Sequence, residues 1–460
     1  MAVYTSGVKK AITAAGATST YQTLDGLLKD FYGPRIAETL NNENFMLKRL
    51  EKRKDMKWSG RKVMFPVHTK RNTGVGFRDE TGNIPDPGGQ FYKQAEVTDV
   101  LFYGTIQLTG LALDAVLSDR GGFRRALDSE MQGLVNDSKN HFGRAVWGMP
   151  VNGTGSNADR LNCVLGTQTG AVVGGKSTIL SPLGYANADA ASTTRYFRVG
   201  QALAWGDPSE AAQFGKNAPV GTGSGYVASV DSATQISVVA ETGIAPAGGD
   251  QFVIGSNHTN GSFEYDNGLN GLGTLDSSFQ GLTGQTFQGI PVTSGGDYTW
   301  QTYSKAHGDA TFDTTFLHSL LHNVQELGSG SPTMLASHYS LLLEYVNVAD
   351  AATRYSNDII KGGYQTITFA SDKVYDWVVD KFCPYGYVFA LDETNMFWAV
   401  RRDFGWDDRG GSVLKSLAAG SGAQDGVKAF YKAYLQLAFN NLNSHGIAYG
   451  IKVDSADLPR

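Results

Sequence analysis

Two stretches of the chain carry residues at spacings known from chemical sites. The first, Gly170–Ser177, reads GAVVGGKS, the pattern of a phosphate-binding loop in which backbone N–H groups and a helix N-terminus hold phosphate. That chemistry requires a helix after the loop, and the following TILSPLG cannot sustain one. In a chain with 57 glycines we interpret the match as chance and expect no nucleotide site.

The second stretch is a set of His318, His322 and Glu326, four residues apart on a predicted helix. Zinc accepts such a spacing, but the polar face of any helix can produce it, and no third cluster accompanies it. We favour a solvated or interface histidine pair. His445 has no nucleophile motif near it. We therefore expect no catalytic, cofactor-binding or metal-binding residues, no cofactor, and a protein that is not an enzyme.

Composition limits the class of protein further. Hydrophobic residues make up 41% of 460 residues and charged residues 18%, so the chain can bury a sizeable core. Cys163 and Cys383 lie far apart without metal-type spacing, which indicates buried free thiols in a reducing compartment. The sequence contains neither a run of 18 apolar residues nor a signal-peptide pattern at its start, so we expect no membrane partner and a protein made in the cytosol.

Charge is unevenly distributed along the chain. The net charge of −5 argues against a dedicated nucleic-acid binder. Residues 48–71, however, carry ten basic side chains: Lys48, Arg49, Lys52, Arg53, Lys54, Lys57, Arg61, Lys62, Lys70 and Arg71. This segment could contact DNA phosphates, it could form a solvated helix face, or it could form a patch that pairs with acidic loops such as Asp79-Glu80 of a neighbouring copy. These interpretations stay open at this stage.

The longest predicted element is a helix from about Phe123 to Gly148, about 40 Å long if regular. Its apolar residues recur every three or four positions, at Phe123, Leu127, Met131, Leu134, Val135, Phe142, Ala145 and Val146. The opposite stripe should meet solvent or a partner, and holds Arg124, Asp128, Gln132, Asn136, Asn140 and Arg144. Ser118 and Asp119 can cap the start of the helix, and Pro150 should stop it.

A protruding hairpin precedes this helix. Strand-forming residues over 63–67 and 91–108 flank the turn-rich segment RDETGNIPDPGGQ. A hairpin alone is marginal in water, so this one needs a neighbour to lie on. Its tip, Asp79 to Gln90, holds Pro85 and Pro87, which cannot donate backbone hydrogen bonds, and should therefore not extend a sheet of its own subunit.

The rest of the chain reads as an arm, short helices and further strands. Residues 1–22 form a loose arm, and Pro34 splits residues 24–50 into two short helices. A small β-rich insertion is predicted over 193–265, and a second amphipathic helix begins near Thr311. Alternation over 431–439 and again over 447–451 predicts a closing antiparallel pair. The expected class is α+β, with helices and sheets segregated.

The order of these elements resembles the major capsid proteins of tailed bacteriophages over residues 22–453. The resemblance also lies in three segments: LDGLLKDFYGPRIAETLNNENFMLKRLEKRKDMKWSGRKVMFPV, GLNGLGTLD and LNSHGIAYGIKVD. It implies a peripheral domain with a long spine helix, an axial domain, an extended loop and an N-terminal arm. The implied segments are 1–59 for the arm and short helices, 60–108 for the extended loop, 109–192 for the peripheral domain, 193–265 for the β insertion, 266–304 for peripheral strands and loops, 305–430 for the axial domain, and 431–460 for the closing strands.

The resemblance also implies a function. It would make the chain a structural virion protein whose partners are copies of itself, in head-to-tail hexamers and pentamers that build an icosahedral head around double-stranded DNA. Separate scaffolding, portal and decoration proteins and non-specific DNA contact are implied as well, with assembly in the host cytoplasm. The alternative is a β-rich phage tail, decoration or adhesive module. A nucleotide-dependent enzyme would rest on Gly170–Ser177 alone.

Overall fold

Strands make up most of the described chain, with few helices. The computed structural model describes residues 46, 49–50, 52–53, 58, 60, 62–110, 120–148, 165–169, 172, 175–182, 194–206, 223–241, 244–255, 268–276, 286–292, 300–327, 331–352, 367–370, 374–408, 413–419 and 422–453. The predicted arm, most of the two short helices, the proposed caps of the long helix and Cys163 lie outside these residues. The chain divides into a first unit (Met1–Asn44, Leu101–Phe142, Arg402–Leu435) and a second unit (Phe45–Val100, Gly143–Arg401, Gln436–Arg460).

The first unit contains most of the long helix and a large part of a five-stranded sheet. The helix is α4 (Arg120–Val146), and the sheet has the order β1 (Lys52–Arg53), β18 (Met396–Trp406), β20 (Gly422–Phe439), β19 (Lys415–Ala419), with β4 (Val100–Thr109) also paired to β20. Aromatic rings join helix to sheet: Phe142 lies edge-on to Phe404 with centroids 5.1 Å apart, and Phe102 contacts both. Gly104 leaves room for Leu134, because an added Cβ would lie 3.1 Å from its Cδ1.

Helix α4 confirms the predicted long helix and corrects one expectation about it. The apolar residues Phe142, Ala145 and Val146 are buried as predicted. The opposite stripe does not meet solvent over the C-terminal half, because Asn136, Asn140 and Arg144 are buried too, and each has an interaction partner. Other parts of the chain therefore cover this half of the helix on more than one side, which amphipathic spacing alone does not reveal.

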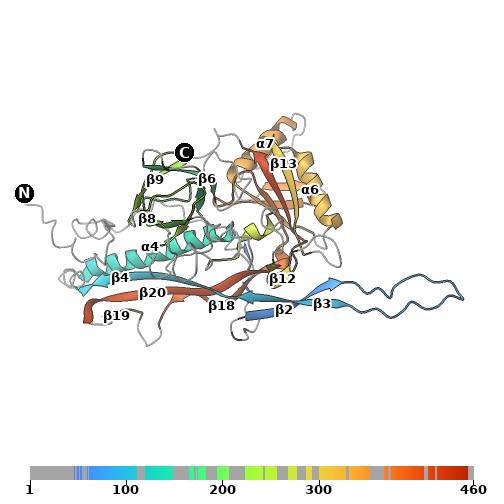
Figure 1. Cartoon of the computed structure of the whole chain (residues 1–460), viewed down its shortest axis with the longest axis horizontal. Helices are drawn as coiled ribbons and strands as arrows, with labels where there is room; N and C mark the ends of the chain where they lie inside the picture. Colours follow the sequence, from blue (N-terminus) through green and yellow to red (C-terminus); the bar gives the residue numbers. More distant parts are fainter. Residues whose placement is uncertain are drawn as a thin grey trace, which may run out of the picture. The chain divides into compact units, whose positions relative to one another are not determined.

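The hairpin consists of β2 (Lys62–Lys70) and β3 (Phe91–Thr98), antiparallel from Lys62↔Thr98 to Lys70↔Phe91. The predicted return strand over 91–108 is two strands, β3 and β4, interrupted at Asp99. Figure 1 shows residues 71–90 as a long loop that continues the direction of the strands. At the other end of the hairpin, Val63 and Val97 are buried against Phe397, Ala399 and Ala438.

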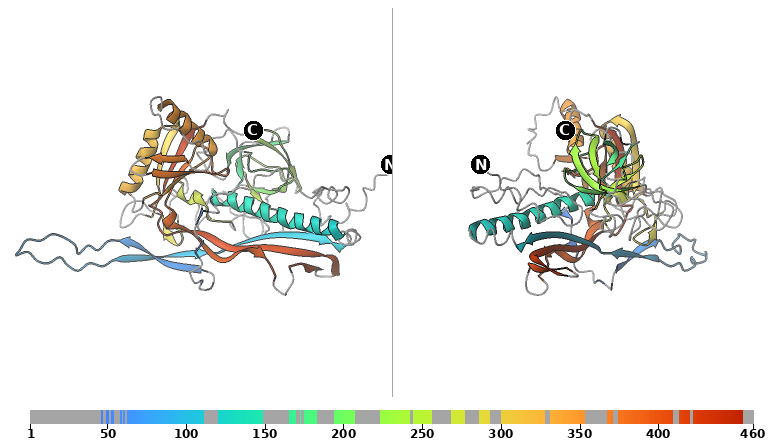
Figure 2. Two further views of the ribbon diagram at one scale, coloured as in Figure 1. Left: turned by 180° about the vertical axis from the view of Figure 1, so that it is seen from behind. Right: turned by 60° about the vertical axis from the view of Figure 1, so that its left-hand side comes forward.

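Six short strands of the second unit form a closed barrel (Figure 2). They are β5 (Gly166–Gln168), β6 (Lys176–Pro182), β7 (Ala202–Gly206), β8 (Gly223–Val230), β9 (Gln235–Ala240) and β10 (Gln251–Ile254), in the order β10-β5-β6-β9-β8-β7. Leu203, Trp205, Val227, Ile236 and Phe252 are fully buried. Strands β5 and β6 precede residue 193, so the barrel begins earlier along the chain than the β-rich segment predicted over 193–265.

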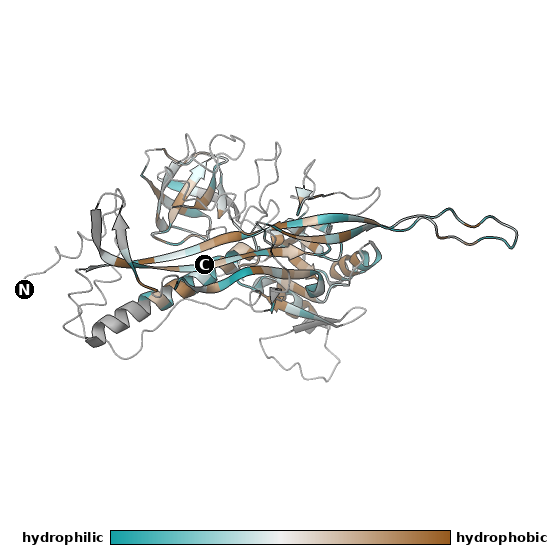
Figure 3. Ribbon diagram, turned by 90° about the horizontal axis from the view of Figure 1, so that it is seen from below, coloured by the Kyte–Doolittle hydropathy of each residue, from teal (hydrophilic) through white to brown (hydrophobic). Residues whose placement is uncertain are grey.

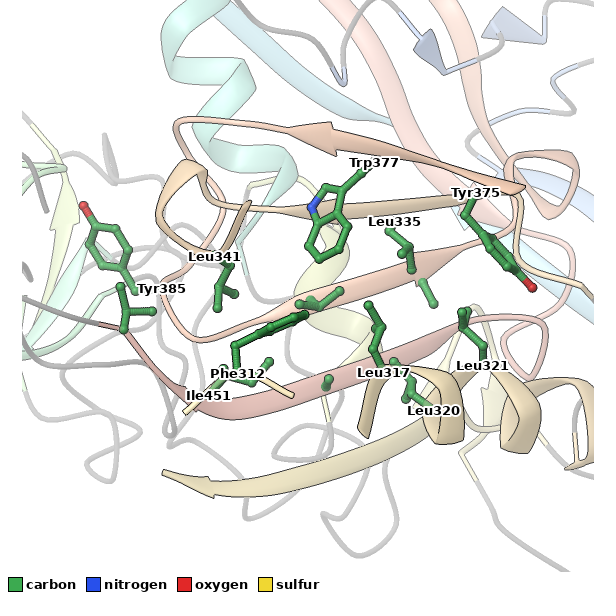
Figure 4. Packing of buried hydrophobic residues seen from close by; sticks show 14 residues of the cluster. Phe312, Leu317, Leu320, Leu321, Leu335, Leu341, Tyr375, Trp377, Tyr385 and Ile451 are labelled. Atoms are coloured by element: carbon green, nitrogen blue, oxygen red, sulfur yellow. The ribbon is translucent and has the colours of Figure 1, made fainter. Parts of the chain in front are cut away.

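A six-stranded sheet of the second unit carries a large apolar cluster. It runs in the order β13 (Tyr303–Thr311), β21 (Gly446–Lys452), β17 (Val388–Leu391), β14 (Met334–Ser337), β16 (Val374–Val379), β15 (Ile367–Ala370). Helices α6 (Thr314–Leu327) and α7 (Tyr339–Ala352) pack on one face. Figure 4 shows Leu317, Leu320 and Leu321 of α6 turned toward Leu335 and Trp377 of the sheet. The predicted second amphipathic helix is thus confirmed as α6.

The predicted closing pair of 431–439 with 447–451 is wrong. Strand β20 belongs to the five-stranded sheet, whereas β21 pairs in parallel with β13 and antiparallel with β17 in the six-stranded sheet. The chain changes sheets at His445 and Gly446, where β21 runs close beneath α6, since a Cβ on Gly446 would lie 2.4 Å from Val324 Cγ2. Alternation identifies a strand but not its partner.

A glycine-rich turn packs against the C-terminal end of α4. The 3₁₀ helix η3 (Leu272–Leu275) follows Gly271, and Gly273 N donates a hydrogen bond to Gly148 O at 3.0 Å. An added Cβ on Gly271 would lie 2.4–2.7 Å from the carbonyl oxygens of Gly148, Val146 and Ala145. The segment GLNGLGTLD therefore reaches the end of the helix with backbone atoms, which only glycine permits. The short strands β11 (Thr286–Phe287) and β12 (Ile290–Pro291) and the 3₁₀ helix η4 (Glu393–Asn395) complete the described elements.

Candidate assembly surfaces

The loop of residues 71–90 exposes large apolar side chains. Val75 is 83% exposed, Phe77 104% and Ile84 88%. Figure 3 shows short hydrophobic stretches interrupting an otherwise hydrophilic loop. Leaving Phe77 in water forgoes about 2 kcal/mol of burial free energy. This loop is therefore a candidate surface for contact with another molecule.

The loop has defined backbone geometry although no strand ladder continues into it. Its two sides approach closely at Gly74 and Gly88, where an added Cβ on Gly74 would lie 2.7 Å from Gly88 N. Asn72 Oδ1 accepts a hydrogen bond from Gly74 N at 2.7 Å. At the tip, Gly82 N donates to Asp79 O at 3.0 Å, closing a turn. Residues 79–90 form no strand, as the two prolines predict.

The charged groups at the tip make few contacts with the described residues. Arg78 Nε donates to the carbonyl oxygen of Asn83 at 3.1 Å, and Glu80 N donates to Asp79 Oδ1 at 2.9 Å. Asp79, Glu80 and Asp86 are exposed, and none of the three carboxylates forms an ion pair with a described residue. The tip is thus anionic as well as apolar.

A second candidate surface is one face of the five-stranded sheet in the first unit, which we call the lysine face. Along β20 the odd-numbered residues Ala429, Tyr431, Ala433 and Leu435 are buried, and the even-numbered ones turn to the other side. The lysine face consists of Leu101, Tyr103, Lys415, Lys428, Phe430, Lys432 and Tyr434. The ammonium groups of Lys415, Lys428 and Lys432 lie 5.8, 5.3 and 5.2 Å from the Phe430 ring centre.

A buried carboxylate holds part of this positive charge in place. Asp407 Oδ2 accepts hydrogen bonds from Lys415 Nζ at 2.7 Å and Lys432 Nζ at 2.8 Å, and Arg402 Nη1 lies 3.6 Å from Oδ1. These lysines lower the pKa of the Asp407 carboxyl well below its usual range. Lys428 contacts the Phe430 ring and no carboxylate of the described residues. The four cations around one carboxylate leave the face cationic.

The described part of the basic segment 48–71 is largely engaged within the second unit. Arg49 forms ion pairs with Asp376 at 2.8 Å and with Glu393, and its pKa is raised chiefly by the Glu393 hydrogen bond. Lys62 pairs with Glu96, and Lys70 lies 5.5 Å from the Phe91 ring centre. These contacts within one chain were not among the interpretations made from the sequence, and they leave Arg49, Lys62 and Lys70 less available to DNA phosphates.

The other sequence candidates lie in structural settings. A strand, β6, follows Gly175, so the Gly170–Ser177 stretch has no helix N-terminus to offer a phosphate. His318 and His322 lie on α6 with ring centres 6.4 Å apart, and the described residues include no group of three or more His, Cys, Asp or Glu side chains placed to hold a metal. Cys383 is a buried free thiol, and burial raises its pKa.

His445 is a buried structural residue. Its Nδ1 accepts a hydrogen bond from Asp392 N at 3.1 Å, and the ring lies edge-on to Phe439 with centroids 5.5 Å apart. Burial lowers its pKa to about 4. The histidine therefore fixes the point where the chain passes from β20 to β21, and it is neutral at pH 7.

Sequence reasoning missed Arg195, which joins the barrel segment to the turns after β16. Its guanidinium stacks on Tyr385 at 4.0 Å from the ring centre and on Tyr196 at 4.6 Å, and it donates to the carbonyl oxygen of Cys383. Burial of a cation without a carboxylate is costly, and the two rings and the carbonyl oxygens replace the water it loses. A single arginine in a loop gives no periodic signal, so no pattern could have identified it.

Comparisons with known proteins give low-level similarity to capsid structures. A scan against protein-family models and a search of curated proteins both find no match. Among solved structures, the chain is similar to "Cyanophage A-1(L) capsid asymmetric unit" (11% identity, 91% of this chain and 96% of that chain, TM-score 0.49). It is also similar to "Mycobacterium phage Bobi" (10%, 94% and 99%, 0.42) and to "Capsid of native GTA particle computed with C5 symmetry" (8%, 95% and 100%, 0.41). Similarity at this level does not by itself define a family. The hairpin loop and the lysine face are therefore the features that bear on function.

No helix of the described residues is both long enough and apolar enough to cross a lipid bilayer.

Proposed function

We propose that this chain is a major capsid protein of a tailed bacteriophage, a structural subunit without enzymatic activity. Copies associate head to tail into hexamers and pentamers, and these build an icosahedral head around double-stranded DNA. Scaffolding, portal and decoration functions belong to separate proteins, and assembly takes place in the host cytoplasm. The segments predicted from the sequence supply the proposed domain plan with two changes: the barrel begins at β5, before residue 193, and the strands after residue 430 belong to two different sheets.

The observation that carries the proposal is the exposed hairpin loop. Its apolar side chains are uncovered, and its base is rigidly attached through Val63 and Val97 to buried residues of β18 and β20. A rigid arm with an apolar end suits a contact with a second copy better than a free monomer. A loop that docks on a different surface of its neighbour lets each copy both give and receive an arm, an arrangement that can close into rings.

The alternative, a β-rich tail, decoration or adhesive module, would place the function on the closed barrel. The barrel exposes Val199, Val230, Val239 and Ile244 singly on its surface. Scattered apolar residues of this kind are normal on soluble proteins. The loop, by contrast, carries its three exposed apolar side chains on one short segment, which favours the assembly function.

The test is replacement of residues 80–89 by a short Gly-Ser turn. No core residue is lost, so the variant should fold with a near-native circular dichroism spectrum and thermal midpoint. It should fail to form hexamers, pentamers or shells in electron microscopy and sedimentation, because the inter-subunit arm is gone.

A control is Val199→Ser, just before barrel strand β7, which removes an apolar side chain that is 68% exposed. It should assemble like the parent. Shells of parental heat stability from the loop-shortened chain, or a sharp monomer of the parent chain at high concentration, would refute the proposal.

A further inference from the structure

The hairpin tip and the lysine face each carry an excess of charge, and the two excesses are of opposite sign. The hairpin tip carries Asp79, Glu80 and Asp86 without ion pairs to described residues. The lysine face carries Lys428 without a carboxylate, and Lys415 and Lys432 share the single carboxylate of Asp407. A surface that keeps such charges unpaired in the monomer can use them to select a partner.

The apolar groups of the two surfaces also match. On the tip, Val75, Phe77 and Ile84 flank the acidic residues. On the lysine face, Leu101 is 53% exposed and Tyr103 50% exposed, beside the Lys432 ammonium 5.6 Å from the Tyr103 ring centre. Each surface therefore interleaves large apolar side chains with an excess of charge of one sign: three carboxylates against Arg78 on the tip, and four cations against Asp407 on the lysine face.

We propose that the lysine face of one copy is the docking site for residues 75–86 of the hairpin loop of a second copy. The carboxylates of Asp79, Glu80 and Asp86 meet the ammonium groups of Lys428, Lys415 and Lys432, while Phe77 and Ile84 cover Leu101 and Tyr103. This inference rests on the proposed assembly function and names the residues that would select the neighbour. Exposed ion pairs are individually weak, so the apolar contacts supply most of the affinity and the charges supply orientation and register.

The occupant favoured by these observations is a second copy and not a nucleic acid. Asp407 lies beneath the lysines and offsets part of their charge, which would weaken attraction to phosphate. The half-exposed Leu101 would also gain nothing from a phosphate backbone, whereas it can pack against Phe77 or Ile84. The loop supplies both kinds of group that the face lacks.

The test is a charge exchange in the full-length chain. Lys428→Glu and Glu80→Lys are made singly and together, and assembly is followed by light scattering and electron microscopy at about 0.1 M salt, where the Debye length is about 10 Å. Each single variant should raise the protein concentration needed for half-assembly about fivefold or more. The double variant should recover most of that loss, because the pair is restored with its signs exchanged.

Lys452→Glu on β21 is the control, since it changes an exposed lysine outside the lysine face. It should assemble at the parental concentration, and thermal midpoints should show that all variants are folded. Raising salt to about 0.5 M should weaken assembly of the parent more than that of the uncharged double variant Lys428→Gln with Glu80→Gln.

Three outcomes would overturn the inference. Single variants could assemble like the parent, or the double variant could be no better than the singles. Alternatively, Lys428→Glu could abolish binding of a 30-base-pair DNA duplex while leaving assembly unchanged, which would make the face a nucleic-acid surface. The chain with residues 80–89 replaced tests the proposed function separately. Its failure to assemble would show that the loop is needed, whichever surface the loop contacts.

Discussion

The cluster beneath α6 and α7 and the hairpin loop use the same kinds of side chain for opposite purposes. Leu320, Leu321 and Leu335 are fully buried, and their burial against Trp377 stabilises the sheet (Figure 4). Phe77 and Ile84 are exposed and contribute nothing comparable to the fold of a single copy. Residues of the first kind stabilise the fold of a single copy, whereas residues of the second kind stay exposed and are proposed to contact a neighbour. Mutations in the two regions should therefore have separable effects.

The largest effect on folding is expected for Leu320→Asp. The change places a carboxylate at a position with 0% exposure, and burying it should cost several kcal/mol or force it to be protonated. Soluble, folded protein should be lost, as measured by expression and circular dichroism. Thr315→Asp, in the exposed first turn of the same helix, should be neutral or slightly stabilising because of the helix dipole. Normal shells from Leu320→Asp would contradict the packing described for α6.

A smaller but clear loss is expected for Gly271→Ala at the end of α4. The added Cβ meets three backbone carbonyl oxygens that cannot move aside independently, and the free energy of unfolding should fall by about 1–3 kcal/mol. Gly133→Ala within α4 is the matched control, since its Cβ would meet nothing within 4 Å. That control should gain about 1 kcal/mol from helix propensity. Equal stability of the two variants in urea unfolding would show that the glycine-rich turn does not lie against the helix end.

The junction at His445 predicts an acid dependence of stability. Its pKa in the folded protein is lowered to about 4 from an ordinary value near 6.5, so between these values the unfolded chain binds a proton that the folded chain does not. The free energy of unfolding should therefore fall with decreasing pH below 6.5, by about 1.4 kcal/mol per pH unit for this group, until about pH 4.

His338, whose pKa burial lowers to about 2, adds a second contribution of the same sign. Urea unfolding at several pH values measures the slope. His445→Asn, which can keep the acceptor for Asp392 N, should lower this slope by the contribution of one proton. An unchanged slope in His445→Asn would contradict the buried neutral state.

The smallest effect on stability, and the sharpest contrast, is expected for Phe77→Ser. Its side chain is fully exposed, so the free energy of unfolding should stay within about 0.5 kcal/mol of the parent. Assembly should nevertheless be impaired, which sedimentation velocity and electron microscopy would detect. A large loss of stability in the monomer would mean that the loop serves the fold and not a neighbour.

Elements with strong local signals were predictable from the sequence. The period of apolar residues identified α4 to within a few residues, and the turn-rich segment between β2 and β3 identified the hairpin and the absence of strand at its tip. Both signals lie within one contiguous stretch of chain.

Features created by contacts between distant segments were not predictable. Strand β5 has only three residues, so its part in the barrel depends on β6 and β10 rather than on its own pattern. Alternation in β20 and β21 gave no information on their partners, and the burial of Asn136 and Asn140 depends on what covers the polar side of α4. The lysine face joins β4, β19 and β20, and Asp407 lies between β18 and β19 along the chain, so no single stretch contains the face.

A β-bulge in β13 affects how two copies of the chain can meet at this edge of the six-stranded sheet. This strand stands at one end of the six-stranded order, and its pairing with β21 is interrupted between Ala306 and Ala310, where Gly308 and Asp309 take left-handed backbone angles of +67° and +57°. An uninterrupted edge would offer a template for stacking onto the edge of any other newly made chain. The bulge interrupts that template, which disfavours edge-to-edge pairing of two copies of the chain through β13.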